Sequence, residues 1–131
     1  MNTNGIILSK YAFQLIKEYL RRDQKIAPPN KQKLIDELKN ATVIGSKEIP
    51  GNVVSINTRV EIRDLETEQV HAFELVAPDK AKVKHNRLSV LCPIGLASIG
   101  YHQGDEVAWE MPDGKKRYLI EKVGPGSPDK R

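Results

Sequence analysis

The sequence is poor in cysteine and in long apolar runs, and each shortage excludes a class of protein. Cys92 is the single cysteine among 131 residues, so no internal disulfide can form, which is typical of a reducing compartment. No apolar stretch approaches the roughly 18 residues of a membrane-spanning helix. The N-terminus lacks the basic start and apolar centre of a signal peptide. We therefore expect a cytoplasmic protein with no membrane segment.

Recognisable catalytic and cofactor motifs are also missing. The chain has no Gly-rich phosphate loop, no paired cysteines for zinc and no nucleophile in a known motif. Its three histidines, His71, His85 and His102, have no metal-ligand spacing. The sequence predicts no enzyme, no metal site and no cofactor, and it predicts that Cys92 is a small half-buried apolar residue rather than a redox group.

Positive charge is concentrated near the N-terminal end. The formal net charge is +4, and residues 1–50 hold nine Lys and Arg against five Asp and Glu, whereas residues 51–131 hold twelve of each. A basic segment favours an acidic protein surface or nucleic-acid phosphate as its partner. A second basic cluster, from Lys80 to Arg87, is a candidate phosphate-binding strip. It lacks interleaved aromatic residues for base stacking, which makes a nucleic-acid module the weaker interpretation.

Two amphipathic helices are predicted before residue 48. Ser9 is a candidate N-cap for a helix that runs to about residue 22, with apolar residues at helical spacing. The Pro28-Pro29 step must interrupt that helix. Asn30 is a candidate N-cap for a second helix over residues 31–41. Two helices that each carry an apolar stripe, joined by a short loop, predict an antiparallel hairpin.

The apolar spacing changes to a period of two after a Gly- and Pro-containing linker at residues 45–52, which predicts a domain boundary there. Strands are expected over residues 53–63, 70–76, 88–91, 107–111 and 117–123. Phe73 and Trp109 are predicted core residues, and Pro112-Asp113-Gly114 predicts a hairpin turn. The sequence thus divides into a helical hairpin (1–48), an α+β domain with a mostly antiparallel sheet (49–123) and a disordered tail (124–131).

The stretch from Arg87 to Val107 combines several signals in about twenty residues. A short apolar strand stops at Cys92-Pro93, where proline suits the first position of a helix. About two helical turns follow, and Gly100 can adopt the left-handed conformation that closes them. Gly104-Asp105 then turns the chain into the next strand.

This stretch resembles the C-terminal domain of the Gre transcript cleavage factors. The resemblance lies in S-V-L-C-P-I-G-L-A-S-I-G followed by G-D-E-V, while W-E-M-P-D-G is similar to the shorter Rnk proteins of the same superfamily. It covers roughly residues 49–123 and implies an FKBP-like fold for this curved sheet with one short helix. The family usually has serine where this chain has Cys92. Because cysteine caps poorly, we expect a helix start that is looser by up to about 1 kcal/mol.

The resemblance also implies a test at the hairpin tip. Gre factors insert a long coiled coil into the secondary channel of RNA polymerase and present acidic residues that help to hold a catalytic Mg²⁺. Carboxylates are required because Mg²⁺ prefers hard oxygen ligands. Here the tip contains five basic residues and one acid, namely Arg21, Arg22, Asp23, Lys25, Lys31 and Lys33. Each helix is also short, so the hairpin reaches only about 20 Å.

Together with the basic, short tip, the resemblance implies a non-enzymatic transcription regulator that docks on RNA polymerase at the secondary-channel rim without stimulating transcript cleavage. The resemblance places the docking surface on Cys92, Pro93, Ile94, Gly95 and Ala97, although the apolar members could equally pack the helix on the sheet. The basic tip is either a solvated charge run or a contact with the channel rim, nucleotide or RNA. Two other functions stay open: an FKBP-fold prolyl isomerase or chaperone, and a basic RNA-binding adaptor.

Overall fold

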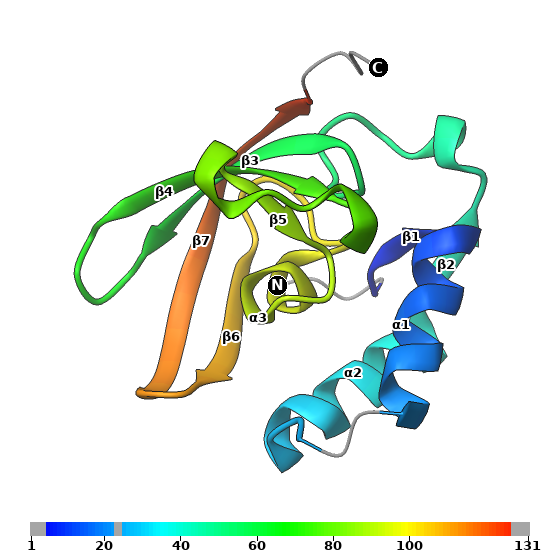
Figure 1. Ribbon diagram of the computed structural model, residues 1–131, viewed down its shortest axis with the longest axis horizontal. Coiled ribbons are helices and arrows are strands. Elements are labelled where there is room, and N and C mark those ends of the chain that lie inside the picture. Colours follow the sequence, from blue (N-terminus) through cyan, green and yellow to red (C-terminus); the bar gives the residue numbers. More distant parts are fainter. Residues whose placement is uncertain (1–4, 23–24, 127–131) are drawn as a thin grey trace.

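The change from helical to alternating apolar spacing separates two parts of the fold. The computed structural model describes residues 5–22 and 25–126. Within them, two helices and a two-stranded sheet lie beside a curved five-stranded sheet that carries a third helix (Figure 1). The elements are β1 (Ile7–Ser9), α1 (Lys10–Arg22), α2 (Pro28–Asn40), β2 (Thr42–Ile44), β3 (Thr58–Asp64), β4 (Val70–Val76), β5 (Arg87–Ser89), α3 (Pro93–Ser98), β6 (Glu106–Met111) and β7 (Gly114–Pro125). The α+β class is confirmed.

Helix α1 begins as the sequence predicts. The Ser9 hydroxyl oxygen accepts a hydrogen bond from the Ala12 N–H at 3.1 Å, which satisfies one of the donors left free at a helix start. Strand β1 before it pairs in parallel with β2 after α2. The sequence did not reveal these two strands, because three residues are too few to show alternation.

Helix α2 begins at Pro28 rather than at Lys31. Pro28 and Pro29 occupy its first two positions, where a missing N–H costs nothing, and Ala27 is the N-cap. The prediction that Asn30 caps this helix is therefore wrong. Asn30 lies inside the first turn and is buried. The antiparallel-hairpin and FKBP-like descriptions stay predictions, and we refer below to α1 and α2 as the helix pair.

The five-stranded sheet has the order β5-β4-β3-β7-β6, in which β4 and β5 are parallel and the other neighbours antiparallel. Strand β4 has the predicted bounds, and Met111 pairs with Gly114 across the predicted turn. Strand β3 begins five residues later than predicted. The residues before it are engaged elsewhere: the Val54 N–H donates to the Tyr101 carbonyl at 2.8 Å.

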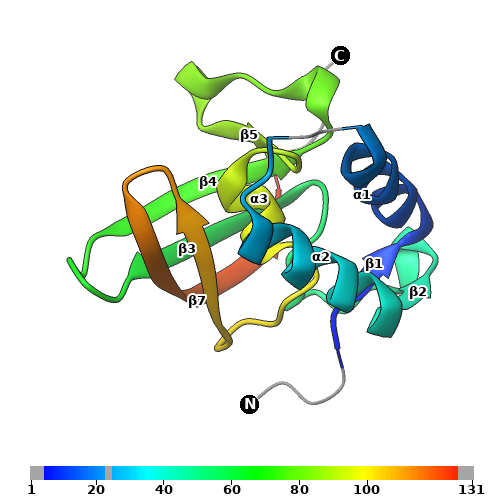
Figure 2. The same ribbon diagram turned by 90° about the horizontal axis from the view of Figure 1, so that it is seen from below.

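Helix α3 follows β5 and ends at Ser98, two residues before the predicted closing glycine, Gly100. Gly100 has φ +87°, and a Cβ there would lie 2.7 Å from the Ile6 Cβ. The Gly100 carbonyl accepts a hydrogen bond from the Ile7 N–H at 3.1 Å, so the end of α3 abuts β1 (Figure 2). Only glycine suits both the dihedral angle and the close approach.

Both parts of the chain contribute to one hydrophobic core. Ile16 and Leu34 of the helix pair are buried in the same cluster as Val60, Leu96 and Trp109. The predicted tail begins too early, because residues 124 and 125 belong to β7; residues 127–131 lie outside the described part. No helix in the described ranges is long and apolar enough to cross a membrane.

Candidate functional site

Helix α2 is fastened to the outer edge of the sheet by Asn30. The Asn30 Nδ2 donates to the Glu110 carbonyl at 2.8 Å, and the Glu110 N–H donates to the Asn30 Oδ1 at 2.8 Å. Glu110 lies in β6, which is an edge strand. The side-chain amide thus occupies backbone groups that would otherwise be open to a foreign strand. We call this pair of hydrogen bonds the Asn30 clasp.

One turn further along α2, a half-buried polar cluster makes a second connection. The Lys33 Nζ donates to the Glu37 Oε2 at 2.6 Å and to the Tyr101 hydroxyl at 3.0 Å, and that hydroxyl donates to the Glu37 Oε2. The Lys33 ammonium also lies 5.0 Å from the centre of the Tyr101 ring and 5.7 Å from that of Trp109. The prediction that Lys33 belongs to the basic tip is wrong, since it faces the sheet.

This cluster is partly shielded from water, since the Lys33 and Glu37 side chains are 28% and 13% exposed. Burial raises the pKa of the Tyr101 hydroxyl well above its ordinary value, and the neighbouring Glu37 carboxylate raises it further. The second Glu37 oxygen, Oε1, is buried and accepts no hydrogen bond from any residue that the structure describes. The Glu37 charge is therefore compensated mainly by Lys33. The Asn30 clasp and this cluster together hold α2 against β6 and the segment after α3.

The tip of the helix pair is basic, but two of its charges are already paired. The Arg21 Nη2 lies 2.7 Å from the Glu18 Oε2, and the Arg22 Nε lies 3.0 Å from the same oxygen. The hydrogen bond from Arg21 lowers the pKa of Glu18, so this carboxylate stays ionised. Lys25 is exposed and Lys31 half-buried. The predicted tip residue Asp23 lies outside the described residues.

The five residues predicted to dock on a partner differ in accessibility. Pro93 is exposed, and Cys92 and Ile94 are half-buried, whereas Gly95 and Ala97 are buried. A Cβ on Gly95 would lie 2.6 Å from the Ser89 carbonyl oxygen, so this glycine allows α3 to pack against the loop before it. Gly95 and Ala97 therefore lie beneath the predicted docking surface and are not part of its exposed area.

Cys92 is the N-cap of α3, as predicted, and its side chain makes no capping hydrogen bond. Burial raises the pKa of its thiol above the ordinary value. The thiol is thus protonated at neutral pH and a poor nucleophile. This agrees with the expected apolar role.

A cavity of about 260 Å³ joins the two predicted regions. The turn between the helices contributes Lys25 and Ile26, the motif contributes Leu91 and Pro93, and β6 contributes Trp109. Trp109 is 3% exposed and was predicted only as a core residue. No local sequence pattern indicates that α2 folds back onto β6, so the tip and the motif were predicted as two separate regions. Of the predicted site residues, Lys25 from the tip and Pro93 from the motif line this hollow.

The histidines, the remaining candidates for catalysis or metal binding, lie apart from one another. His71 and His85 are exposed, and the His102 Nδ1 lies 3.8 Å from the Asp105 Oδ2. Within residues 5–22 and 25–126, no three His, Cys, Asp or Glu side chains are grouped as a metal site. Phe73, like Trp109, is buried in the core as predicted.

Comparison with known proteins identifies relatives of this architecture. The profile of the family described as "Transcription elongation factor, GreA/GreB, C-term" matches residues 49–125. The "Regulator of nucleoside diphosphate kinase" of Escherichia coli (strain K12) is 32% identical over 119 residues, which span 91% of this chain and 88% of that protein. The "Transcription elongation factor GreA" of Hyphomonas neptunium is 37% identical over 69% of this chain, which spans 57% of that protein.

Solved structures agree with these relatives. A "Prokaryotic transcription elongation factor GreA/GreB from Nitrosomonas europaea" superimposes with a TM-score of 0.67 at 30% identity, covering 92% of this chain and 98% of that chain. Gfh1 of Thermus aquaticus, with a TM-score of 0.52 and 18% identity, shares the fold.

Proposed function

This chain belongs to the GreA/GreB C-terminal family of transcription elongation factors, and we propose that it regulates transcription by docking on RNA polymerase at the secondary-channel rim without stimulating transcript cleavage. Its relatives support a role in transcription. The observation that carries the rest of the proposal is the 260 Å³ cavity, because the family motif and the tip of the helix pair both line it. The proposed site of action is the cytoplasm.

The chemistry of this surface favours an acidic partner with one protruding apolar side chain. Pro93 and the half-buried Ile26 offer apolar contact in the hollow, and Lys25 stands at its margin. Arg21 and Arg22 add positive charge on the adjacent end of α1. Complementary charge guides the encounter, and a desolvated apolar anchor supplies most of the affinity.

Two features argue against transcript cleavage. Helices α1 and α2 have 13 residues each, so the helix pair extends about 20 Å at about 1.5 Å per residue. Near the tip, Glu18 is held by two arginines. A carboxylate engaged in this way is poorly placed to ligate Mg²⁺, which favours several free oxygen ligands. The proposed mechanism is steric: the docked protein occupies the channel entrance and displaces Gre-type factors.

Co-sedimentation with core RNA polymerase tests the docking step. We expect retention that a Gre factor competes away. Lys25→Glu should reduce retention, because it reverses a charge at the margin of the cavity. Lys17→Glu, an exposed lysine of α1 that does not line the cavity, is the matched control and should bind like the parent. Equal retention of all three proteins would contradict the proposed surface, and no retention of the parent would remove the proposal.

The steric mechanism has its own assay. Added to backtracked elongation complexes, the protein should leave the transcript uncut and should inhibit cleavage by an added Gre factor in a dose-dependent way. Stimulated hydrolysis of the transcript would overturn the non-cleaving part of the proposal while leaving the docking part intact.

A further inference from the structure

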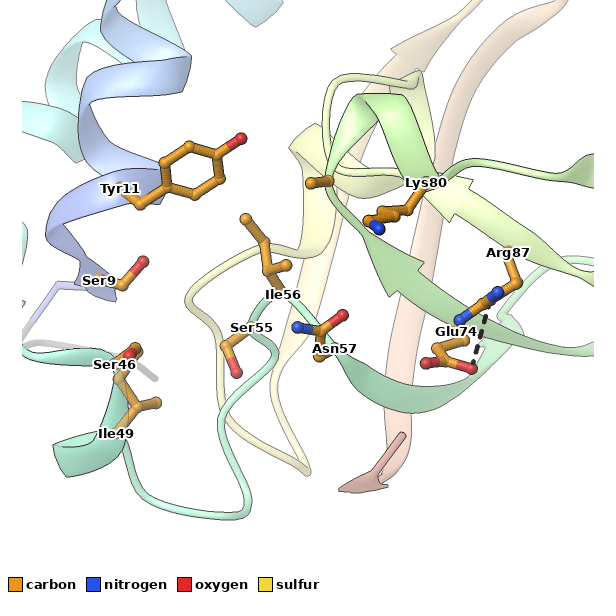
Figure 3. A pocket seen from close by; sticks show the side chains of 11 residues that line it. Ser9, Tyr11, Ser46, Ile49, Ser55, Ile56, Asn57, Glu74, Lys80 and Arg87 are labelled. Atoms are coloured by element: carbon orange, nitrogen blue, oxygen red, sulfur yellow. Dashed lines mark ion pairs between the residues drawn. The ribbon is translucent and has the colours of Figure 1, made fainter. Parts of the chain in front are cut away.

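A second and larger hollow lies at the other end of α1. It is a cleft of about 470 Å³ between the first turn of α1, the segment before β3 and the side of the sheet formed by β4 and β5 (Figure 3). It shares no lining residue with the cavity beside Pro93. Its volume falls in the range of about 300–1,000 Å³ that is typical of small-molecule sites.

Glu74 forms part of the cleft and has unused hydrogen-bonding capacity. Its side chain is only 10% exposed, and its charged partner, the Arg87 Nε, is 3.9 Å from the Glu74 Oε1. That distance is too long for a hydrogen bond, and no described residue donates one to this carboxylate. Glu74 is not among the described residues whose side-chain oxygens are fully buried without a partner, so its carboxylate opens onto the cleft. Glu74 is therefore suited to accept hydrogen bonds from a ligand in the cleft.

The other lining groups divide the cleft into a cationic end and an apolar end. Lys80 and Arg87 lie with Glu74 on the sheet side, whereas the Tyr11 ring extends from α1 across the opening, with Ile56 between them (Figure 3). Tyr11 is 55% exposed, so its ring is available for stacking. The ligand that matches this order carries an anionic group and hydroxyl donors together toward the sheet side and a flat ring toward α1.

We propose that this cleft binds a nucleoside phosphate. Lys80 and Arg87 bind the phosphates, the Glu74 carboxylate accepts hydrogen bonds from the ribose hydroxyls, and the base lies against Tyr11 and Ile56. A free amino acid would also offer an ammonium and a carboxylate, but it would leave most of the 470 Å³ filled with water. The proposal is independent of polymerase docking, since the two hollows have no residue in common.

Calorimetric titration of the full chain with GDP tests the proposal. We expect one site with a Kd below about 1 mM, and weaker binding of pyrophosphate and of free tyrosine. A short RNA serves as a further probe: tighter binding than GDP would indicate the end of a transcript as the natural source of the nucleotide. Equal affinity for pyrophosphate and GDP would overturn the proposal, as would binding of tyrosine alone or of none of these compounds.

Variants locate the site. Lys80→Ala should weaken GDP binding about tenfold, because it removes a charge-assisted contact to phosphate. Lys84→Ala is the matched control: Lys84 is exposed in the same connection but does not line the cleft, so GDP affinity should be unchanged. Unchanged affinity in Lys80→Ala, or an equal loss in both variants, would contradict the site.

The role of Glu74 is tested by comparing the binding of two nucleotides to one variant. Glu74→Gln keeps the shape of the side chain and should weaken GDP binding several-fold. It should have no effect on the binding of 2′,3′-dideoxy-GDP, which lacks the hydroxyls that Glu74 is proposed to accept from. An equal loss for both nucleotides would show that Glu74 acts only on the fold or on the charge of the cleft. Urea unfolding of each variant checks that the fold is retained.

Discussion

Replacing Asn30 with alanine removes both hydrogen bonds of the Asn30 clasp and tests how α2 is held to the sheet. Asn30 is 6% exposed and both bonds are 2.8 Å long, so neither is a loose surface contact. A typical intramolecular hydrogen bond contributes about 1 kcal/mol net. We therefore expect Asn30→Ala to lower the free energy of unfolding by about 2 kcal/mol, a large fraction of the stability of an ordinary domain.

The chain offers a sharp control for this variant. Glu110 takes part in the clasp only through its backbone N–H and carbonyl, and Glu110 is exposed. Glu110→Ala should therefore change the free energy of unfolding by less than about 0.5 kcal/mol. Urea denaturation measures both variants. Hydrogen exchange at the Glu110 amide supplies a local readout, because exchange should accelerate in Asn30→Ala and stay slow in Glu110→Ala.

Two outcomes would refute this reasoning. If Asn30→Ala unfolds like the parent and the Glu110 amide stays protected, the clasp does not hold the helix pair. If both variants lose about 2 kcal/mol, the loss reflects the edge strand in general rather than the two hydrogen bonds of Asn30.

Three further predictions concern α3 and the turn after β3. Cys92→Ser supplies the missing capping oxygen and should raise the free energy of unfolding by up to about 1 kcal/mol in urea denaturation. Gly95→Ala should lower it by about 2 kcal/mol because its Cβ meets backbone oxygens, whereas Gly51→Ala, in open space, should be nearly neutral. Backbone hydrogen bonds lower the pKa of Asp64, so its contribution to stability is present at neutral pH and lost as the pH falls through its folded pKa. In urea titrations at several pH values, Asp64→Asn should be less stable at pH 7 and should lose less stability on acidification.

The features that the sequence predicted well depend on near neighbours. The Ser9 cap is made with a residue three positions away, and the turn at Pro112-Asp113 is decided by its own residues. Strand β4 was also found with its bounds, because seven residues suffice to show a strand. Local patterns are therefore enough for elements whose stabilising contacts are local.

The assignments that failed depend on contacts far along the chain. Asn30 is a good capping residue, but its partner in the structure is 80 positions away, and no local pattern indicates it. The error at Lys33 has the same origin. With α2 beginning at Pro28, Lys33 falls on the face toward Tyr101 and Trp109 instead of at the tip. The cavity was missed for this reason too, since its walls come from segments that meet only after α2 has folded back.

The position of α2 also changes how the proposed function is understood. A helix pair that projected freely would act as a separate plug, and its attachment to the sheet would matter little. Here Ile26 at the turn and Trp109 in β6 line one cavity, and the clasp holds α2 to that strand. The docking surface then exists only while the helix pair is held in place. Loss of the clasp should therefore weaken polymerase binding, whereas Lys17→Glu, which leaves both the clasp and the cavity lining unchanged, should bind like the parent.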